Sequence, residues 1–204
     1  PLMPRIAGQI DVAKTEAILD AATEVFGKRG VGSSMGEIAR RACVSKQTIY
    51  NHFGSKPELV RAIVDRRVKE ITAPLLVPEA QEHPEEALAA FGRFMIKAVI
   101  RPRGASMMRM TIESALDQPD VARAFYEAGP LTSRRRLADF LTMETKAGRM
   151  AVDDPALGAE FFAGMVIGPY QLSHLLGVAP ELDDAAIDRV ASEAARRFMR
   201  AYSV

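Results

Sequence analysis

Two short helices joined by a tight turn are predicted in residues 35–53. The first lies in MGEIARRACV (35–44) and is amphipathic, and the second lies in SKQTIYNHFGSKPEL (45–59) and is rich in hydrogen-bonding and cationic side chains. Ser45 is suited to cap the second helix, and Gly54 follows it as a stop. A helix, a tight turn and a polar helix of about two turns form a helix-turn-helix, whose second helix enters the DNA major groove. The segment therefore predicts DNA binding.

The apolar residues recur with a helical period along nearly the whole chain, starting with the run from Ile18 to Phe26. Ser34-Met35-Gly36-Glu37 fits a capping box, and Ser55-Lys56-Pro57-Glu58 fits a second one. No strand-like alternation is present, so we expect an all-α fold. The expected organisation is a three-helix DNA-binding domain at 1–54, a connecting helix at 55–71 and a larger helical domain at 72–204.

Proline and glycine positions are expected to divide the larger domain. Prolines 74, 78 and 84 interrupt the chain after the connecting helix. Later breaks delimit about five or six further helices. These breaks are predicted at 101–104, 118–119, 129–130, 148, 154–155 and 177–180.

The net charge of +1 conceals an asymmetry along the chain. Residues 1–71 hold 12 Lys and Arg against 8 Asp and Glu, whereas residues 72–204 hold 15 against 18. The basic first third is the part expected to meet a polyanion. Cys43 is the only cysteine, which excludes an intrachain disulfide and fits a reducing compartment. The apolar run at 161–170 is far shorter than the roughly 20 residues that span a bilayer, and no signal peptide is visible, so we expect a cytoplasmic protein without membrane contact.

Two longer stretches carry a resemblance to a known family. AILDAATEVFGKRG (17–30) and SSMGEIARRACVSKQTIYNHFGSKPEL (33–59) resemble, in order and spacing, the DNA-binding domain of the TetR family of bacterial transcriptional regulators. PDVARAFYEAGP (119–130) and GRMAVDDPALGAEFFAGMVIG (148–168) look like the AefR-like type of C-terminal domain. The resemblance implies a transcriptional regulator, most simply a homodimeric repressor released from a palindromic double-stranded operator by a small apolar effector.

The recognition helix is expected to bury Ile49 and Phe53 and to turn its polar side chains outward. Gln47 is the best candidate for reading a base, because a carboxamide can pair with the N6 and N7 edge of adenine. Lys56 stands at a helix start, where free amides already favour an anion. An ordinary solvated helix face is the alternative interpretation of each residue taken singly. The predicted DNA-binding set, assigned partly by the resemblance, is Ser33, Ser34, Ser45, Lys46, Gln47, Thr48, Tyr50, Asn51, His52 and Lys56.

Cys43 departs from the family pattern, which commonly has glycine at this position. If the backbone there requires a positive φ, the cysteine carries strain that glycine would avoid. The thiol is either a redox sensor at an exposed turn or a tolerated small residue.

Methionines and phenylalanines are frequent in the C-terminal part, where they form either an apolar effector cavity or a plain helical core. The family resemblance favours the cavity. Glu113 is either a pocket charge for a cationic ligand or the partner of Arg109 in a surface pair. The predicted ligand-binding set is Phe94, Met107, Met110, Glu113, Phe125, Met143, Phe161, Met165 and Tyr170.

Two apolar stripes, at about 155–176 and 184–202, are expected to form a four-helix bundle across a two-fold axis. Small residues in the first stripe would let a partner helix approach closely, and Pro169 predicts a kink there. The predicted dimer set is Gly164, Gly168, Leu172, Leu175, Ile187, Val190, Ala194 and Phe198.

An enzyme is the main rival class. Cys43 and His52 lack an oriented third group, and His83 stands among glutamates in a proline-interrupted segment that is better explained as a solvated linker. We therefore expect no catalysis, no cofactor and no metal. A helical adaptor for a protein partner, or a ligand-binding module without operator control, is the remaining alternative.

Overall fold

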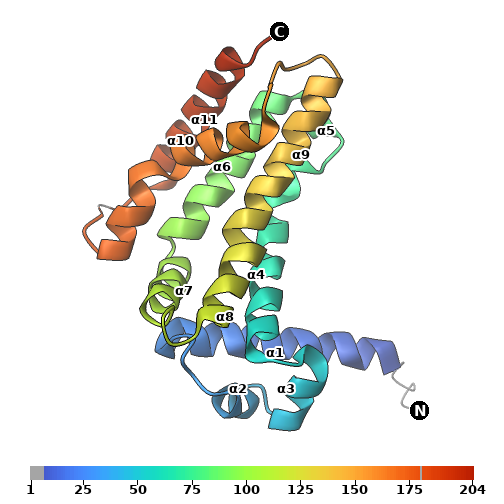
Figure 1. The fold of residues 1–204 in the computed structure, drawn as a ribbon, viewed down its shortest axis with the longest axis vertical. Coiled ribbons are helices and arrows are strands. Elements are labelled where there is room, and N and C mark those ends of the chain that lie inside the picture. Colours follow the sequence, from blue (N-terminus) through green and yellow to red (C-terminus); the bar gives the residue numbers. More distant parts are fainter. Residues whose placement is uncertain (1–6, 180) are drawn as a thin grey trace. The chain divides into compact units, whose positions relative to one another are not determined.

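All regular structure is helical in the computed structural model, which describes residues 7–179 and 181–204 (Figure 1). Those ranges contain no strand, which confirms the all-α prediction. None of their helices is long and apolar enough to cross a membrane. The elements are α1 (Ala7–Arg29), α2 (Met35–Arg41), α3 (Lys46–Phe53), α4 (Lys56–Thr72), η1 (Ala73–Leu75), α5 (Glu79–Glu82), α6 (Pro84–Ile100), α7 (Pro102–Glu113), α8 (Pro119–Tyr126), η2 (Glu127–Leu131), α9 (Thr132–Lys146), α10 (Pro155–Leu176) and α11 (Asp184–Ala201).

The chain forms two compact units. The N-terminal unit contains the chain up to Val64 together with Ser106–Phe125, and the C-terminal unit contains Asp65–Ala105 and Tyr126–Val204. Helices α4 and α7 each run from one unit into the other. The sequence did not indicate that a segment after residue 105 packs with the DNA-binding helices. The predicted functional boundaries at 54/55 and 71/72 stay a prediction.

The N-terminal unit is built on the apolar face of α1. Ile18, Ala22 and Phe26 are fully buried, as their helical spacing predicts. Helix α1 packs against α2, and α2 packs against α3. Ile38 from α2 and Ile49 from α3 are also fully buried, so each of the three N-terminal helices contributes apolar side chains to the interior of this unit.

Prolines mark where helices begin. Pro84, Pro102, Pro119 and Pro155 are the first residues of α6, α7, α8 and α10. Proline fits the first turn because its fixed φ is already helical and its missing N–H would have no partner there. The breaks predicted at 118–119 and 154–155 are thereby confirmed. The break predicted at 129–130 is not a loop, because the chain continues through η2, a π-helical turn.

The π-helical turn follows from Pro130, which lies inside η2 and cannot donate a backbone hydrogen bond. The Thr132 hydroxyl donates to the Glu127 carbonyl oxygen at 2.7 Å. The side chain thus satisfies an acceptor at the altered turn. The chain passes from α8 to α9 without leaving a helical path.

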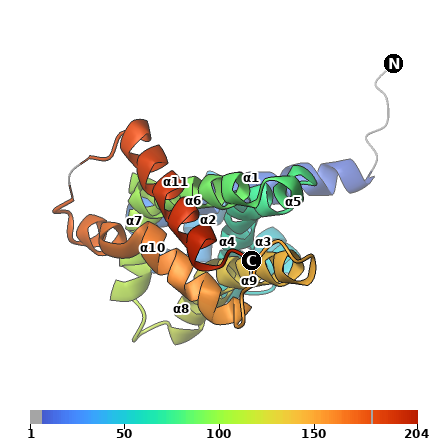
Figure 2. The same ribbon diagram turned by 90° about the horizontal axis from the view of Figure 1, so that it is seen from above.

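The core of the C-terminal unit lies between α6, α10 and α11, which run side by side (Figures 1 and 2). The Phe162 ring lies 6.1 Å from that of Phe91 and 5.3 Å from that of Phe198, measured between centroids. Gly92 permits this packing, because a Cβ there would lie only 3.3 Å from the Ala191 Cβ. Three helices therefore meet around one aromatic cluster.

Burial of the α11 stripe corrects the predicted dimer set. Ile187, Ala194 and Phe198 are at most 5% exposed and belong to the core of their own chain. A helical period shows that a stripe must be covered, but it does not show whether the cover comes from the same chain. Here α6 and α10 supply it, so these three residues are not available to a second subunit.

Helix α10 is kinked where the sequence predicts. Gly168 has φ 18° and ψ −118°, outside the helical range, and Pro169 follows it. Proline removes a donor and clashes with the preceding turn, which accounts for the kink. Leu157, Phe161 and Leu172 are 43%, 53% and 62% exposed along this helix. The helix therefore presents an uncovered apolar face.

Candidate nucleic-acid interface

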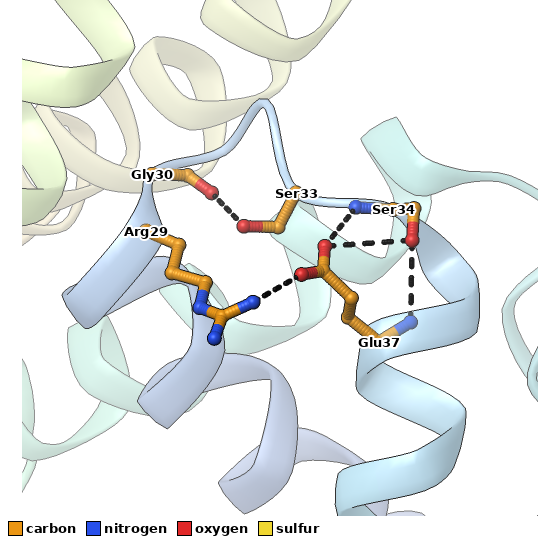
Figure 3. Close-up of polar contacts among 5 residues, drawn as sticks. All are labelled: Arg29, Gly30, Ser33, Ser34 and Glu37. Atoms are coloured by element: carbon orange, nitrogen blue, oxygen red, sulfur yellow. Dashed lines mark hydrogen bonds and ion pairs between the residues drawn. The ribbon is translucent and has the colours of Figure 1, made fainter.

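The start of α2 is fixed by a reciprocal cap (Figure 3). The Ser34 Oγ accepts a hydrogen bond from the Glu37 amide at 3.2 Å, and the Ser34 amide donates to Glu37 Oε2 at 2.9 Å. This confirms the predicted capping box. Arg29, at the end of α1, donates to Glu37 Oε1 at 2.6 Å. The hydrogen bond from the Ser34 backbone amide, and then the one from the Arg29 side chain, lower the pKa of the Glu37 carboxyl from its usual value, so it stays ionised as a link between α1 and α2.

Ser33 is buried, which corrects its place in the predicted DNA-binding set. Its side chain is buried, and its hydroxyl donates to the Gly30 carbonyl oxygen at 2.8 Å (Figure 3). The hydroxyl therefore closes the α1–α2 turn. Ser34 is exposed beside it but uses its oxygen in the cap, so its role toward DNA stays a prediction.

The turn between α2 and α3 is a Schellman motif. The Val44 amide donates to the Ala39 carbonyl at 3.0 Å, and the Cys43 amide donates to the Arg40 carbonyl at 3.3 Å. Cys43 has φ +54°, the left-handed conformation that the motif requires and that glycine adopts without strain. The condition under which the cysteine carries strain, a positive φ, is therefore met. The cysteine side chain is exposed at this turn.

Replacing Cys43 with glycine is expected to stabilise the protein. A left-handed conformation costs a residue with a Cβ about 1–2 kcal/mol. The greater chain entropy of unfolded glycine offsets part of that gain. We expect Cys43→Gly to raise the free energy of unfolding by about 0.5–1 kcal/mol in chemical denaturation, whereas Cys43→Ala should change it little. If the two variants are equally stable, strain at the Cβ is not the cause.

One buried apolar residue and a cap at each end fix the position of the recognition helix α3. Ser45 Oγ accepts the Thr48 amide at 3.0 Å, and Gly54 ends the helix with φ +74°. Ile49 is fully buried and Phe53 is half-buried, as the sequence predicts for the core-facing side. The orientation of the outer face follows directly from the burial of Ile49.

The outer face of α3 gathers five of the predicted DNA-binding residues. Ser45, Lys46, Gln47, Tyr50 and Asn51 are exposed together, at spacings that place them on one side of the helix. The Gln47 Nε2 donates to Asn51 Oδ1 at 2.9 Å, and the Lys46 ammonium lies 5.8 Å from the centre of the Tyr50 ring. The helix thus offers amide donors and acceptors with a flanking cation, which is the chemistry that reads base edges in a major groove.

Two other predicted residues have hydrogen-bond partners within the protein. The Thr48 hydroxyl pairs with the Ser45 hydroxyl at 2.8 Å. His52 is half-buried, and its Nδ1 lies 3.5 Å from the Thr15 hydroxyl on α1. Thr48 therefore adds a contact at the N-terminal cap of α3, and His52 links α3 to α1. Their contact with DNA stays a prediction.

Lys56, the first residue of α4, has a partner that the sequence did not indicate. Its ammonium donates to the Gln118 Oε1 at 2.9 Å, and both side chains are half-buried. Burial lowers the pKa of the Lys56 ammonium below 10.5. The two residues stand 62 positions apart, so no local pattern could have paired them.

The predicted ligand-binding residues are dispersed. Met107, Met110, Glu113 and Phe125 belong to the N-terminal unit, and the other five belong to the C-terminal unit. Exposure further divides the set, because an enclosed apolar cavity needs side chains covered on all sides. Five of them are exposed and therefore do not line an enclosed cavity in the single chain. These are Phe94, Glu113, Met143, Phe161 and Met165. A ligand role stays a prediction for Met107, Met110, Phe125 and Tyr170, which are half-buried.

A hollow of about 460 Å³ lies on α1 and α2, where sequence reasoning had placed no site. Its carboxylates are engaged, with Glu24 bound to Lys28 and Arg41 and Glu37 bound to Arg29. Charged side chains dominate its lining, so it does not suit an apolar effector. Among the residues that the structure describes, no cluster of His, Cys, Asp and Glu is arranged to hold a metal ion.

Comparison with known proteins shows similarity to bacterial DNA-binding regulators. Residues 18–63 match the N-terminal model of bacterial regulatory proteins of the tetR family, and residues 86–204 match the C-terminal domain of AefR-like transcriptional repressors. The Mycobacterium tuberculosis HTH-type transcriptional repressor Rv3405c is 29% identical over 129 residues, which cover 63% of this chain and 68% of that protein.

Solved structures extend the similarity to nearly the whole chain. A structure titled a putative TetR-family transcriptional regulator from Mesorhizobium loti has a TM-score of 0.77 at 27% identity, covering 95% of this chain and 98% of that one. The flavonoid-responsive regulator FrrA has a TM-score of 0.71 at 31% identity, covering 94% of this chain and 97% of its own. The chain therefore belongs to the TetR family of bacterial regulatory proteins and is a DNA-binding transcriptional regulator with an AefR-like C-terminal domain.

Proposed function

We propose that the chain is a homodimeric repressor that binds a near-palindromic operator and is released from it by a small apolar effector. The observation that carries the proposal is the exposed polar face of α3, with Gln47 and Asn51 side by side above the buried Ile49. Repression, as opposed to activation, is supported by the AefR-like repressor domain and the repressor named among the relatives. Its place of action would be the bacterial cytoplasm, where chromosomal DNA lies.

Gln47 and Lys56 are assigned different parts in operator binding. The Gln47 carboxamide, paired with Asn51 and otherwise exposed, is suited to an adenine edge, which specifies sequence. The Lys56 ammonium has three donors and uses one of them on Gln118, so the others can meet a phosphate. Phosphate contacts set position and general affinity without reading sequence.

Alanine variants separate these two parts in fluorescence anisotropy with a selected operator and with random duplex. Lys56→Ala should weaken both and reduce the salt slope of binding by about one. Gln47→Ala should weaken only the operator, by about 1–3 kcal/mol at one base position. Exposed Lys69 and Gln81 supply matched alanine controls outside the N-terminal unit.

Equal losses of affinity on both duplexes for Gln47→Ala would exclude base reading by this residue. If adding the native chain leaves the anisotropy of both duplexes unchanged at every salt concentration, the adaptor alternative is favoured.

The uncovered face of α10 is the proposed dimer surface. Leu157, Phe161, Met165 and Leu172 are exposed there, and a Cβ at the intervening Gly164 would meet no atom within 4 Å. Burying apolar side chains of this size is favourable by about 1.5–3 kcal/mol each. A second copy of the same helix, related by a two-fold axis, would cover the face with an identical one. Half-sites in the operator would then stand roughly 34–36 Å or a multiple apart.

Substitution of Gly164 tests this surface without disturbing the folded chain. Gly164→Leu adds a side chain into open space in one subunit, but it would obstruct close approach of a partner helix. Sedimentation should show a dimer for the native chain and weaker association for the variant. Ala156→Leu, also exposed on α10, is the control and should leave association unchanged. A native chain that stays monomeric at micromolar concentration would exclude the dimer.

An apolar effector is proposed to act on the segment Ser106–Phe125. Met110 packs against α1 near its end, since its Sδ lies 3.3 Å from where a Gly30 Cβ would be. The Ser106 hydroxyl also donates to the Gly27 carbonyl at 3.1 Å. A ligand contacting the neighbouring Met107 or Phe125 would therefore act on the same compact unit as α3. The name of the flavonoid-responsive relative favours an aromatic, largely apolar ligand.

Calorimetry with and without operator tests effector control, with a soluble flavonoid as the first probe. If the effector favours a state that binds operator poorly, linkage requires operator to weaken effector binding by the same factor, typically about 5–150-fold. A Met107→Ala variant should weaken effector binding while leaving operator affinity near that of the native chain. Identical effector affinities in the two titrations would favour a ligand-binding module without operator control.

A further inference from the structure

The Lys56–Gln118 hydrogen bond joins the start of α4 to a segment distant in sequence. Gln118 lies between α7 and α8, where its amide donates to the Ser114 carbonyl at 2.8 Å and its carbonyl accepts from the Val121 amide at 3.1 Å. Its backbone is therefore fixed by hydrogen bonds on both sides. Its side-chain Nε2 lies 3.9 Å from where a Cβ on Gly32 would be. The carboxamide thus reaches both the α1–α2 turn and the ammonium that begins α4.

A lysine side chain has four flexible bonds, and ordering it against a phosphate costs conformational entropy. An acceptor that already holds the ammonium reduces that cost. The nature of the acceptor also matters. A carboxamide oxygen is neutral, so it leaves the full charge of Lys56 for the DNA backbone, whereas a carboxylate in its place would neutralise that charge in an ion pair.

We propose that Gln118 is a positioning residue for DNA binding, which holds the Lys56 ammonium at the start of α4 through the 2.9 Å hydrogen bond and keeps its charge available to a phosphate. The inference rests on the proposed phosphate contact of Lys56. It extends the DNA-binding machinery beyond the three N-terminal helices to the α7–α8 turn. Gln118 touches no base in this scheme, so its effect should be the same on every duplex sequence.

Two replacements of Gln118 separate the parts of this proposal. Gln118→Met keeps the length of the side chain but removes the acceptor, and it should weaken operator and random duplex alike by roughly 5-fold, the size of one hydrogen bond, with the salt slope unchanged. Gln118→Glu keeps an acceptor but neutralises the ammonium, and it should weaken both duplexes and reduce the salt slope by about one. Gln81→Glu makes the same change of net charge at an exposed position of α5 and controls for long-range charge effects.

A double-variant cycle with Lys56→Ala distinguishes positioning from a structural role. In the Lys56→Ala background, Gln118→Met should have no further effect on DNA affinity. An equal loss in both backgrounds, an unchanged affinity for both Gln118 variants, or a gain in affinity for Gln118→Met would each overturn the proposal. Circular dichroism and thermal unfolding of every variant establish that the loss is not one of folding. Failure of the native chain to bind any duplex would instead overturn the proposed function itself.

Discussion

The left-handed turn at Cys43 determines where the recognition helix points. A turn of four residues leaves the backbone few conformations, and the Schellman hydrogen bonds from Cys43 and Val44 select one of them. Burial of Ile49 then fixes the rotation of α3 about its own axis. With direction and rotation both set, the polar face of α3 has no remaining freedom. The strained backbone of Cys43 is thus part of the turn that orients α3, the helix expected to read the DNA sequence.

The N-terminal unit is larger than its three helices because a small helical domain has little apolar surface to bury. The segment Ser106–Phe125 adds that surface, with Met110 against Gly30 and Val121 and Ala124 buried. The addition has a consequence for regulation. A segment that packs against the DNA-binding helices cannot shift without altering their support, so the proposed effector, if bound to it, would act on α1 and the start of α4 directly.

Features set by neighbours along the chain were predicted from the sequence. The capping box of Ser34, the helix start at Pro155 and the kink at Pro169 each depend on a few adjacent residues. Features set by which helices meet were not predicted. The burial of Phe198 under α6 and α10 and the pairing of Lys56 with Gln118 required the fold. Ser33 belongs to this second group, since its burial depends on how the α1–α2 turn folds back on Gly30.

The correction on α11 alters the interpretation of the exposed aromatic residues. Because α11 is buried in the core of its own chain, α10 would contribute most of the association energy of the proposed dimer, and Phe161 and Met165 lie on its uncovered face. These two residues were predicted to touch the effector, yet they are exposed where a cavity would enclose them. Their place in the proposed subunit interface would account for their exposure, because apolar side chains exposed together on one surface mark an interaction site. The proposed effector would then contact the half-buried methionines of α7 and Phe125, inside the unit that carries α3. In this scheme the effector would contact the DNA-binding unit itself. Its effect on DNA binding would not have to pass through the subunit interface first.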